Sequence, residues 1–279
     1  MIAVEDPRLT FARQALGPVS PVPMPGLPPH LLALVDARDV LHVVKRHTDA
    51  GRFRQEAHAY ITVVPHLGDR APKMVAADPV TRSLLLTLLS GQSAVDLPPG
   101  SSAERDAHHS AGATLWALHQ VGPTESGDSV PVYLAERTRW WVGRAHAAGL
   151  ISAPEWRTLL AHADALAVTA MEGAICHLDY QPRNWLVGPD GVVRVLDFEH
   201  ARLDARVRDF ARLEHRHWRF NPYLRQTFFD GYGRPPDETE RDLLIRFGVI
   251  EALTALVRGR ESGNPQLAVH GRTLLDQLI

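Results

Sequence analysis

The stretch HLDYQPRNWLVGPDGVVRVLDFE, which runs from His177 to Glu199, decides the fold. Its apolar run at 185–187 (WLV) is typical of a short strand. Turn-forming residues follow at 188–191 (GPDG), and a second apolar run at 192–196 returns the chain. The stretch therefore predicts a β-hairpin that brings the residue after its second strand back beside the residues before its first.

Three side chains with oxygen atoms flank this hairpin. Asp179 and Asn184 precede it, five positions apart, and Asp197 follows it directly. Phosphoryl transfer to an alcohol needs a carboxylate that orients the hydroxyl and accepts its proton, and further oxygen atoms that hold Mg²⁺. The spacing indicates Asp179 as the base, and Asn184 and Asp197 as the metal ligands. Each residue alone would be an ordinary turn or cap residue, but the combination favours a phosphotransferase.

On these residues the chain resembles the aminoglycoside phosphotransferase and choline kinase family, a branch of the protein-kinase-like fold. The family pattern is His-Gly-Asp, four residues, Asn, and then Asp-Phe or Asp-Trp, often with Glu. Here Leu178 replaces the glycine, and Gln181 stands where protein kinases usually have a lysine. The resemblance implies an α+β fold of two lobes: a small N-lobe with a mixed β-sheet at residues 1–89, which binds nucleotide, and a larger, mainly helical C-lobe at 90–279.

The nucleotide-binding residues are predicted upstream. Residues 40–45 (VLHVVK) predict a strand that ends in Lys45, and 52–64 a helix with Glu56 near the edge of its buried face. In the family that the chain resembles, such a lysine holds the nucleotide phosphates and the glutamate fixes the lysine. The resemblance places the hinge in the apolar run at 83–89 and implies Mg²⁺ with ATP or GTP as the phosphate donor. The candidate hinge residues are Thr87, Leu88 and Leu89.

The phosphate-binding loop has no clear sequence motif. No Gly-x-Gly-x-x-Gly precedes the lysine strand, and residues 17–29 contain two glycines among six prolines. Since proline has no amide proton to offer a phosphate, this segment predicts a rigid extended linker. Two positions are possible for the phosphate-binding loop: the turn after residues 30–35 and the segment around Gly26.

Helices are predicted for the rest of the chain from apolar periodicity, and from a capping box in which Ser152 precedes Glu155 by three positions. The resemblance gives His177 and Asp209 a supporting role at the catalytic loop. The predicted helices cover residues 102–119, 152–171, 238–257 and 265–278.

Composition excludes several other classes of protein. The formal net charge of −2 gives no case for binding nucleic acid or an anionic membrane surface. No apolar run approaches the roughly 18 residues of a membrane span, and the first 20 residues lack a signal peptide's apolar stretch. We therefore expect a cytoplasmic protein. The one cysteine, Cys176, excludes an internal disulfide and a cysteine-rich zinc site, and the fifteen histidines show no clear set of metal ligands.

The expected acceptor is a small molecule. The resemblance favours a hydroxyl of a cationic antibiotic, either an aminoglycoside or a basic peptide such as capreomycin or viomycin, which would give resistance. A metabolite such as choline, a sugar or an amino alcohol is the alternative. A polycation needs carboxylates around its pocket, and helices of the C-lobe are rich in them. The candidate substrate carboxylates are Glu199 and Glu214, with Asp204, Asp230 and Glu251 as further acidic residues of this region.

Two other classes of function fit part of the pattern. A nucleotide-binding pseudokinase would keep the fold without chemistry, but it has no need of base, metal ligands, lysine and glutamate together. A metal-dependent hydrolase could use His177, Asp179 and Asp197 as ligands, yet it would leave Lys45 and Glu56 without a role.

Overall fold

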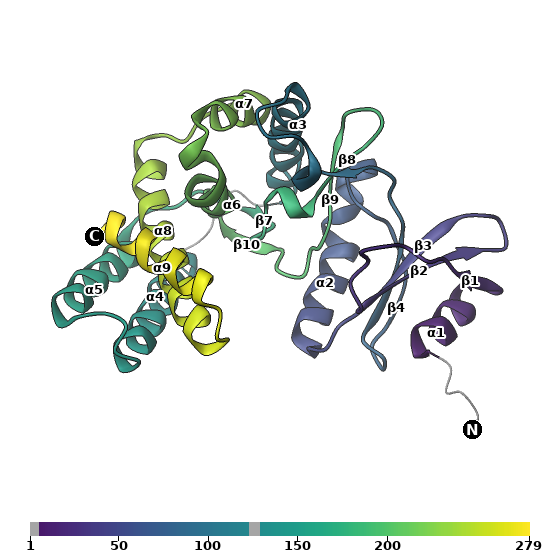
Figure 1. The fold of residues 1–279 in the computed structure, drawn as a ribbon, viewed down its shortest axis with the longest axis horizontal. Helices are drawn as coiled ribbons and strands as arrows, with labels where there is room; N and C mark the ends of the chain where they lie inside the picture. Colours follow the sequence, from purple (N-terminus) through teal and green to yellow (C-terminus); the bar gives the residue numbers. More distant parts are fainter. Residues whose placement is uncertain (1–5, 123–128) are drawn as a thin grey trace. The chain divides into compact units, whose positions relative to one another are not determined.

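The computed structural model describes residues 6–122 and 129–279 (Figure 1). The chain divides into two compact units that are each discontinuous in sequence. Unit 1 comprises Met1–Leu118 and Pro182–Arg202, and unit 2 comprises His119–Gln181 and Leu203–Ile279. The predicted boundary at residue 89, between an N-lobe and a C-lobe, is not tested by this division and stays a prediction.

The first part of unit 1 contains a five-stranded antiparallel sheet with strand order β1-β2-β3-β5-β4. Its elements are α1 (Pro7–Leu16), β1 (Val19–Pro21), β2 (Leu31–Asp36), β3 (Leu41–Arg46), α2 (Ala50–Thr62), η1 (Val64–Arg70), β4 (Met74–Asp78) and β5 (Ser83–Thr87). Leu34, Val44 and Leu85 are fully buried in one cluster with residues of α1. Because side chains alternate along a strand, Lys45 points to the opposite face, toward α2.

The proline-rich segment differs from the predicted linker. Part of it forms β1, where Val19 pairs with Asp36 and Pro21 with Leu34. β1 is the edge strand of the sheet, so the missing N–H of proline costs no bond to a further strand. The residues between β1 and β2 include Gly26, one of the two predicted places for the phosphate-binding loop.

The predicted hairpin is confirmed in the second part of unit 1. Its strands β8 (Trp185–Val187) and β9 (Val193–Val195) pair antiparallel, and Gly191 occupies the left-handed region at φ 74° that the turn requires. Helix α3 (Ser102–His119), which has the predicted bounds, bonds to β9: Thr114 Oγ1 donates to the Val193 carbonyl at 2.9 Å. The remaining elements are β6 (Gln92–Ser93), which pairs with β8, η2 (Ala94–Asp96) and η3 (Pro182–Asn184).

Unit 2 is mainly helical, so the chain is α+β as predicted. The two strands of its small sheet are β7 (Gly173–Cys176) and β10 (Arg202–Ala205). Its helices are α4 (Ser129–Ala147), α5 (Ala153–Val168), α6 (Arg208–Arg212), η4 (Leu213–His217), η5 (Trp218–Phe220), α7 (Pro222–Tyr232), α8 (Glu238–Glu261) and α9 (Pro265–Leu278). The predicted helix at 152–171 ends three residues early, and the one at 238–257 continues to Glu261.

Helices α8 and α9 pack with their backbones in close contact (Figure 1). A Cβ atom added at Gly271 of α9 would lie 2.4 Å from the Leu256 nitrogen, and one at Gly259 of α8 would lie 2.3 Å from the Ala268 nitrogen. Only glycine allows this approach.

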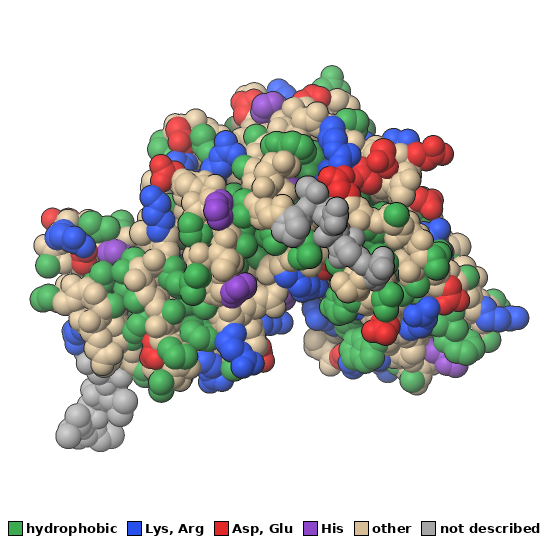
Figure 2. Space-filling view, turned by 180° about the vertical axis from the view of Figure 1, so that it is seen from behind, with side chains coloured by type: hydrophobic (Ala, Val, Ile, Leu, Met, Phe, Trp, Pro, Cys, Tyr) green, Lys and Arg blue, Asp and Glu red, His purple; other side chains and the backbone are tan. Residues whose placement is uncertain are grey.

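The surface mixes both signs of charge, and on the face shown in Figure 2 the basic and acidic side chains are interspersed. Among the described residues, no helix combines the length and the apolar character that crossing a membrane requires.

Candidate active site

In unit 1, Lys45 connects the predicted glutamate to the hairpin. Its Nζ lies 2.7 Å from Glu56 Oε2 and 2.6 Å from Asp197 Oδ1. The Glu56 side chain is fully buried, and a buried carboxylate is stable only when it is paired. Burial would lower the pKa of the Lys45 ammonium, but the carboxylates of Glu56 and Asp197 outweigh it and raise the pKa. The structure therefore brings these three predicted residues together around one fixed positive charge.

His47 is a member of this cluster that sequence reasoning missed. Its Nε2 lies 2.7 Å from Glu56 Oε2, and its Nδ1 lies 3.8 Å from Glu199 Oε2. Glu199 is also bound by Arg52, whose Nη1 lies 2.9 Å from Glu199 Oε1. His47 follows Lys45 by two positions, so the alternation of an extended chain places it on the same face. This spacing of two positions is the feature of the sequence that could have identified His47.

The hairpin brings Asn184 and Asp197 to the same end, as its spacing predicts. The Leu196 N–H donates to the Asn184 carbonyl at 2.9 Å, and the Phe198 N–H donates to Glu56 Oε1 at 3.2 Å. Asp197 has a left-handed backbone at φ 69°, which costs a non-glycine residue about 1–2 kcal/mol and is least costly for Asn and Asp. The side chains of Asn184 and Asp197 offer amide and carboxylate oxygens, the ligand type that Mg²⁺ prefers.

In unit 2, the predicted base Asp179 is buried in the loop after β7, where Gln181 and Arg212 bind it. Gln181 Nε2 donates to Asp179 Oδ1 at 2.7 Å, and the Arg212 guanidinium forms an ion pair with the same oxygen. Leu178, which replaces the family's glycine, takes the left-handed conformation at φ 62° that glycine would favour. The loop thus keeps the glycine-type backbone without a glycine.

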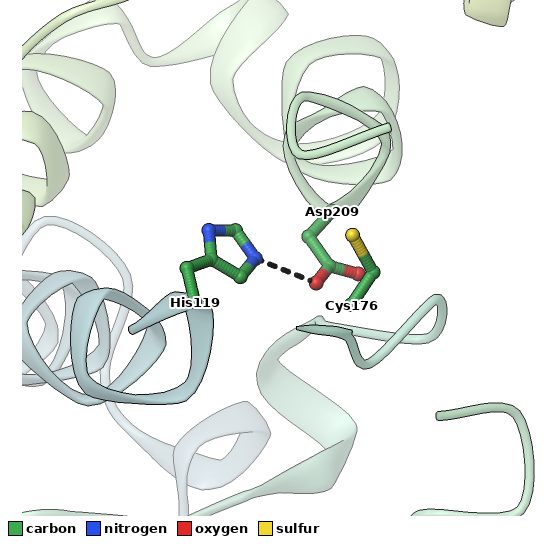
Figure 3. A group of neighbouring side chains, drawn as sticks. All are labelled: His119, Cys176 and Asp209. Atoms are coloured by element: carbon green, nitrogen blue, oxygen red, sulfur yellow. Dashed lines mark hydrogen bonds and ion pairs between the residues drawn. The ribbon is translucent and has the colours of Figure 1, made fainter. Parts of the chain in front are cut away.

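Asp209 fixes this backbone from the start of α6. Its Oδ1 accepts the Leu178 N–H at 2.5 Å, and its Oδ2 accepts the His177 N–H at 2.7 Å. His119 also contacts Oδ2, with its Nε2 at 3.0 Å (Figure 3). Both side chains of the His119–Asp209 pair are fully buried. These contacts agree with the supporting role predicted for Asp209.

A chain of hydrogen bonds extends from Asp209 through His119. Arg206 Nη1 donates to the Tyr232 oxygen at 2.8 Å, and that oxygen lies 2.7 Å from His119 Nδ1. Burial lowers the pKa of His119, so the ring is neutral at pH 7. We assign the tautomer from the network: Tyr232 donates to Nδ1, and the Nε2–H donates to Asp209.

Cys176 lies beside this pair (Figure 3), and its Sγ donates to the Ala205 carbonyl at 3.4 Å. The ligand atoms of His119, Cys176 and Asp209 lie within 4.8 Å of one another. Both ring nitrogens of His119 and both oxygens of Asp209 already have protein partners. The cluster is therefore a hydrogen-bond network that supports the loop that carries Asp179.

The candidate substrate carboxylates are bound to arginines. Glu199 pairs with Arg52, and Glu214 Oε2 lies 2.9 Å from Arg225 Nε. The other acidic residues also have partners: Asp204 is bound by Arg208, Asp230 by Gln226, and Glu251 by Arg212 and Arg216.

At the predicted hinge, Thr87 Oγ1 accepts the Lys73 N–H at 2.9 Å, and the Leu88 N–H donates to the Leu41 carbonyl at 3.1 Å. The Leu88 N–H is therefore already used inside unit 1. The assignment of Thr87, Leu88 and Leu89 to the nucleotide base stays a prediction.

Comparison with solved structures places the fold in the protein-kinase-like class. A structure of the gentamicin complex of APH(2")-IIa shares 13% identity and a TM-score of 0.67, and the match covers 99% of this chain and 97% of that one. Plasmodium vivax ethanolamine kinase shares 16% identity and a TM-score of 0.68, with 96% and 84% covered. The macrolide 2'-phosphotransferase MphH from Brachybacterium faecium shares 15% identity and a TM-score of 0.66, with 96% of both chains covered.

The family is defined by sequence. The model of the phosphotransferase enzyme family, APH, matches residues 35–244. The chain belongs to this family and is a small-molecule phosphotransferase, which confirms the predicted class of enzyme. A search of curated proteins finds no match.

Proposed function

We propose that the chain transfers the γ-phosphoryl group of ATP or GTP to a hydroxyl of a small-molecule acceptor. The observation that carries this proposal is Lys45, a buried lysine held between Glu56 and Asp197, where it can bind nucleotide phosphates. Asn184 and Asp197 would hold Mg²⁺, which neutralises charge on the phosphates when bound. Thr87, Leu88 and Leu89 would contact the nucleotide base.

Asp179 is the proposed catalytic base. Its carboxylate would orient the acceptor hydroxyl and accept its proton. Gln181 and Arg212 bind one carboxylate oxygen, and Asp209 fixes the backbone of the two preceding residues. These contacts restrict the carboxylate to one position, which is what a base acting on a bound hydroxyl requires.

An antibiotic hydroxyl is the acceptor class that we propose first, and phosphorylation would then give resistance. It is supported by the antibiotic phosphotransferases among the similar structures, whereas the ethanolamine kinase among them favours an amino alcohol as the second candidate. We place the enzyme in the cytoplasm, where ATP is available and a free thiol such as that of Cys176 stays reduced.

Two variants separate the proposed roles. Asp179→Asn should lower transfer by at least a hundredfold while magnesium-dependent binding of ATP persists, because the base acts on the acceptor. Asp197→Asn should instead weaken that nucleotide binding. The matched control is Asp230→Asn, which changes an exposed carboxylate that Gln226 binds and should behave as the wild type. Normal turnover in both site variants would overturn the assignment.

A further inference from the structure

A hollow of about 460 Å³ lies in unit 2 between η4, η5 and α9. This volume is within the range of small-molecule sites. Four of its lining side chains are basic: His215, Arg216, Arg219 and His270. Phe220 and the leucines of α9 add an apolar wall, and the lining contains no carboxylate among the described residues.

The basic groups of the hollow keep part of their hydrogen-bonding capacity. Arg219 is exposed and lies over the Phe220 ring, with its Cζ 5.2 Å from the ring centre. The Arg216 Nε and the His270 Nε2 are buried atoms without a hydrogen-bond partner. Burial, followed by the positive charge of Arg216, lowers the pKa of His270. The positive charge of the hollow therefore comes mainly from Arg216 and Arg219, because the lowered pKa of His270 reduces the charged share of its ring.

Glu251 connects the hollow to the proposed base. Arg212 pairs with Asp179, and its Nε lies 3.5 Å from Glu251 Oε2. Arg216, which lines the hollow, pairs with the other oxygen of Glu251. One carboxylate and two guanidinium groups thus separate the hollow from Asp179. An acceptor whose anionic end occupies the hollow would extend past these groups to bring its hydroxyl to Asp179.

The charge of this region selects against a polycation. Basic side chains repel ammonium groups, and the candidate carboxylates Glu199 and Glu214 are already bound to arginines. Arginine instead binds carboxylate and phosphate oxygens through charge-assisted, often bidentate, hydrogen bonds. We propose that this hollow is an acceptor subsite, and that the acceptor carries an anionic oxygen group on a partly apolar body. The inference rests on the proposed function and narrows its substrate class.

Binding of inorganic phosphate tests the subsite without turnover. The enzyme is first saturated with magnesium and ADP, so that phosphate does not occupy the nucleotide site, and the histidine ring signals are followed by NMR. Phosphate at millimolar concentration should shift the signals of His270 saturably, and Arg219→Gln should weaken this binding roughly tenfold. Arg260→Gln, an exposed arginine of α8 outside the hollow, is the control and should change nothing. Unmoved His270 signals, or equal affinity in Arg219→Gln, would overturn the proposal.

Matched acceptors test whether the subsite serves the reaction. Glucuronate is compared with glucose, and ribose 5-phosphate with ribose, so that carboxylate and phosphate are distinguished; gentamicin is the cationic comparator. In each pair, the acidic acceptor should have a kcat/KM at least roughly tenfold higher than the neutral one. Arg219→Gln should remove this preference by raising the KM of the acidic acceptor. Equal use of neutral or cationic acceptors would overturn the subsite and leave the proposed function intact. If phosphate binds at His270 but no acceptor of the panel is phosphorylated, the anion site is supported and the proposed function is contradicted.

Discussion

Replacing Asp209 by Asn should destabilise unit 2 by about 3–5 kcal/mol. The carboxylate accepts three hydrogen bonds, from the N–H groups of Leu178 and His177 and from His119. An amide has only one oxygen, so either orientation turns its NH₂ group toward an N–H donor. A buried donor without an acceptor costs about 1–3 kcal/mol, and two further bonds each lose about 1 kcal/mol when the charge is removed.

Thermal unfolding measures this effect. A loss of this size lowers the Tm by roughly 10 °C for a domain of this length. Turnover measured well below the new Tm should also fall, because the backbone that precedes Asp179 is no longer fixed. Asp230→Asn, an exposed change on α7, is the matched control and should shift the Tm by no more than about 2 °C. A shift of Asp209→Asn no larger than that of the control would refute the reasoning.

Three more outcomes follow from the structure. Gly271→Ala places a Cβ 2.4 Å from a backbone nitrogen of α8 and should lower the free energy of unfolding, measured in urea, by about 1–3 kcal/mol. Gly143→Ala, whose Cβ would meet no atom within 4 Å, is the control and should not destabilise the protein. Leu178→Gly should retain activity and change the free energy of unfolding by no more than about 1 kcal/mol. Relief of the strain in the left-handed backbone offsets the larger conformational entropy that glycine loses on folding. Hydrogen bonds to the Asp36 carboxylate, the strongest of them from the Val40 N–H, lower its pKa to about 2. The stability that the ionised carboxylate contributes is therefore present above about pH 4 and is lost as the pH falls toward 2. Acid titrations of stability for the wild type and Asp36→Asn should differ in that window, and coinciding curves would contradict this assignment.

The hairpin and the lysine–glutamate pair could be predicted because their signals are local. The strand runs and the turn at 188–191 lie in one continuous stretch, and Lys45 and Glu56 are eleven positions apart. Two more helix starts have local signals in the sequence. Asp6 before α1 and Asn221 before α7 are N-cap residues, and each is followed by a proline in the first turn.

The contacts around Asp179, the proposed base, could not be predicted. His119 and Asp209 are 90 positions apart, and Arg212 reaches Asp179 in its loop from α6, the helix that also carries Asp209. Nothing in the spacing of these residues indicates the pairing, because it depends on how His119, α6 and the loop pack within unit 2. The same holds for Glu214, whose pairing with Arg225 is set by the turn between η4 and α7.

The most direct test of the proposed function is the fate of the γ-phosphoryl group. ATP labelled with ¹⁸O in that group, and separately labelled GTP, is incubated with the enzyme, magnesium and a panel of antibiotics, amino alcohols and acidic sugars, and the products are weighed by mass spectrometry. We predict an acceptor heavier by one labelled phosphoryl group in the wild type, and no such product in Asp179→Asn. Label found only in inorganic phosphate, released at the same rate by both proteins, would contradict the proposal.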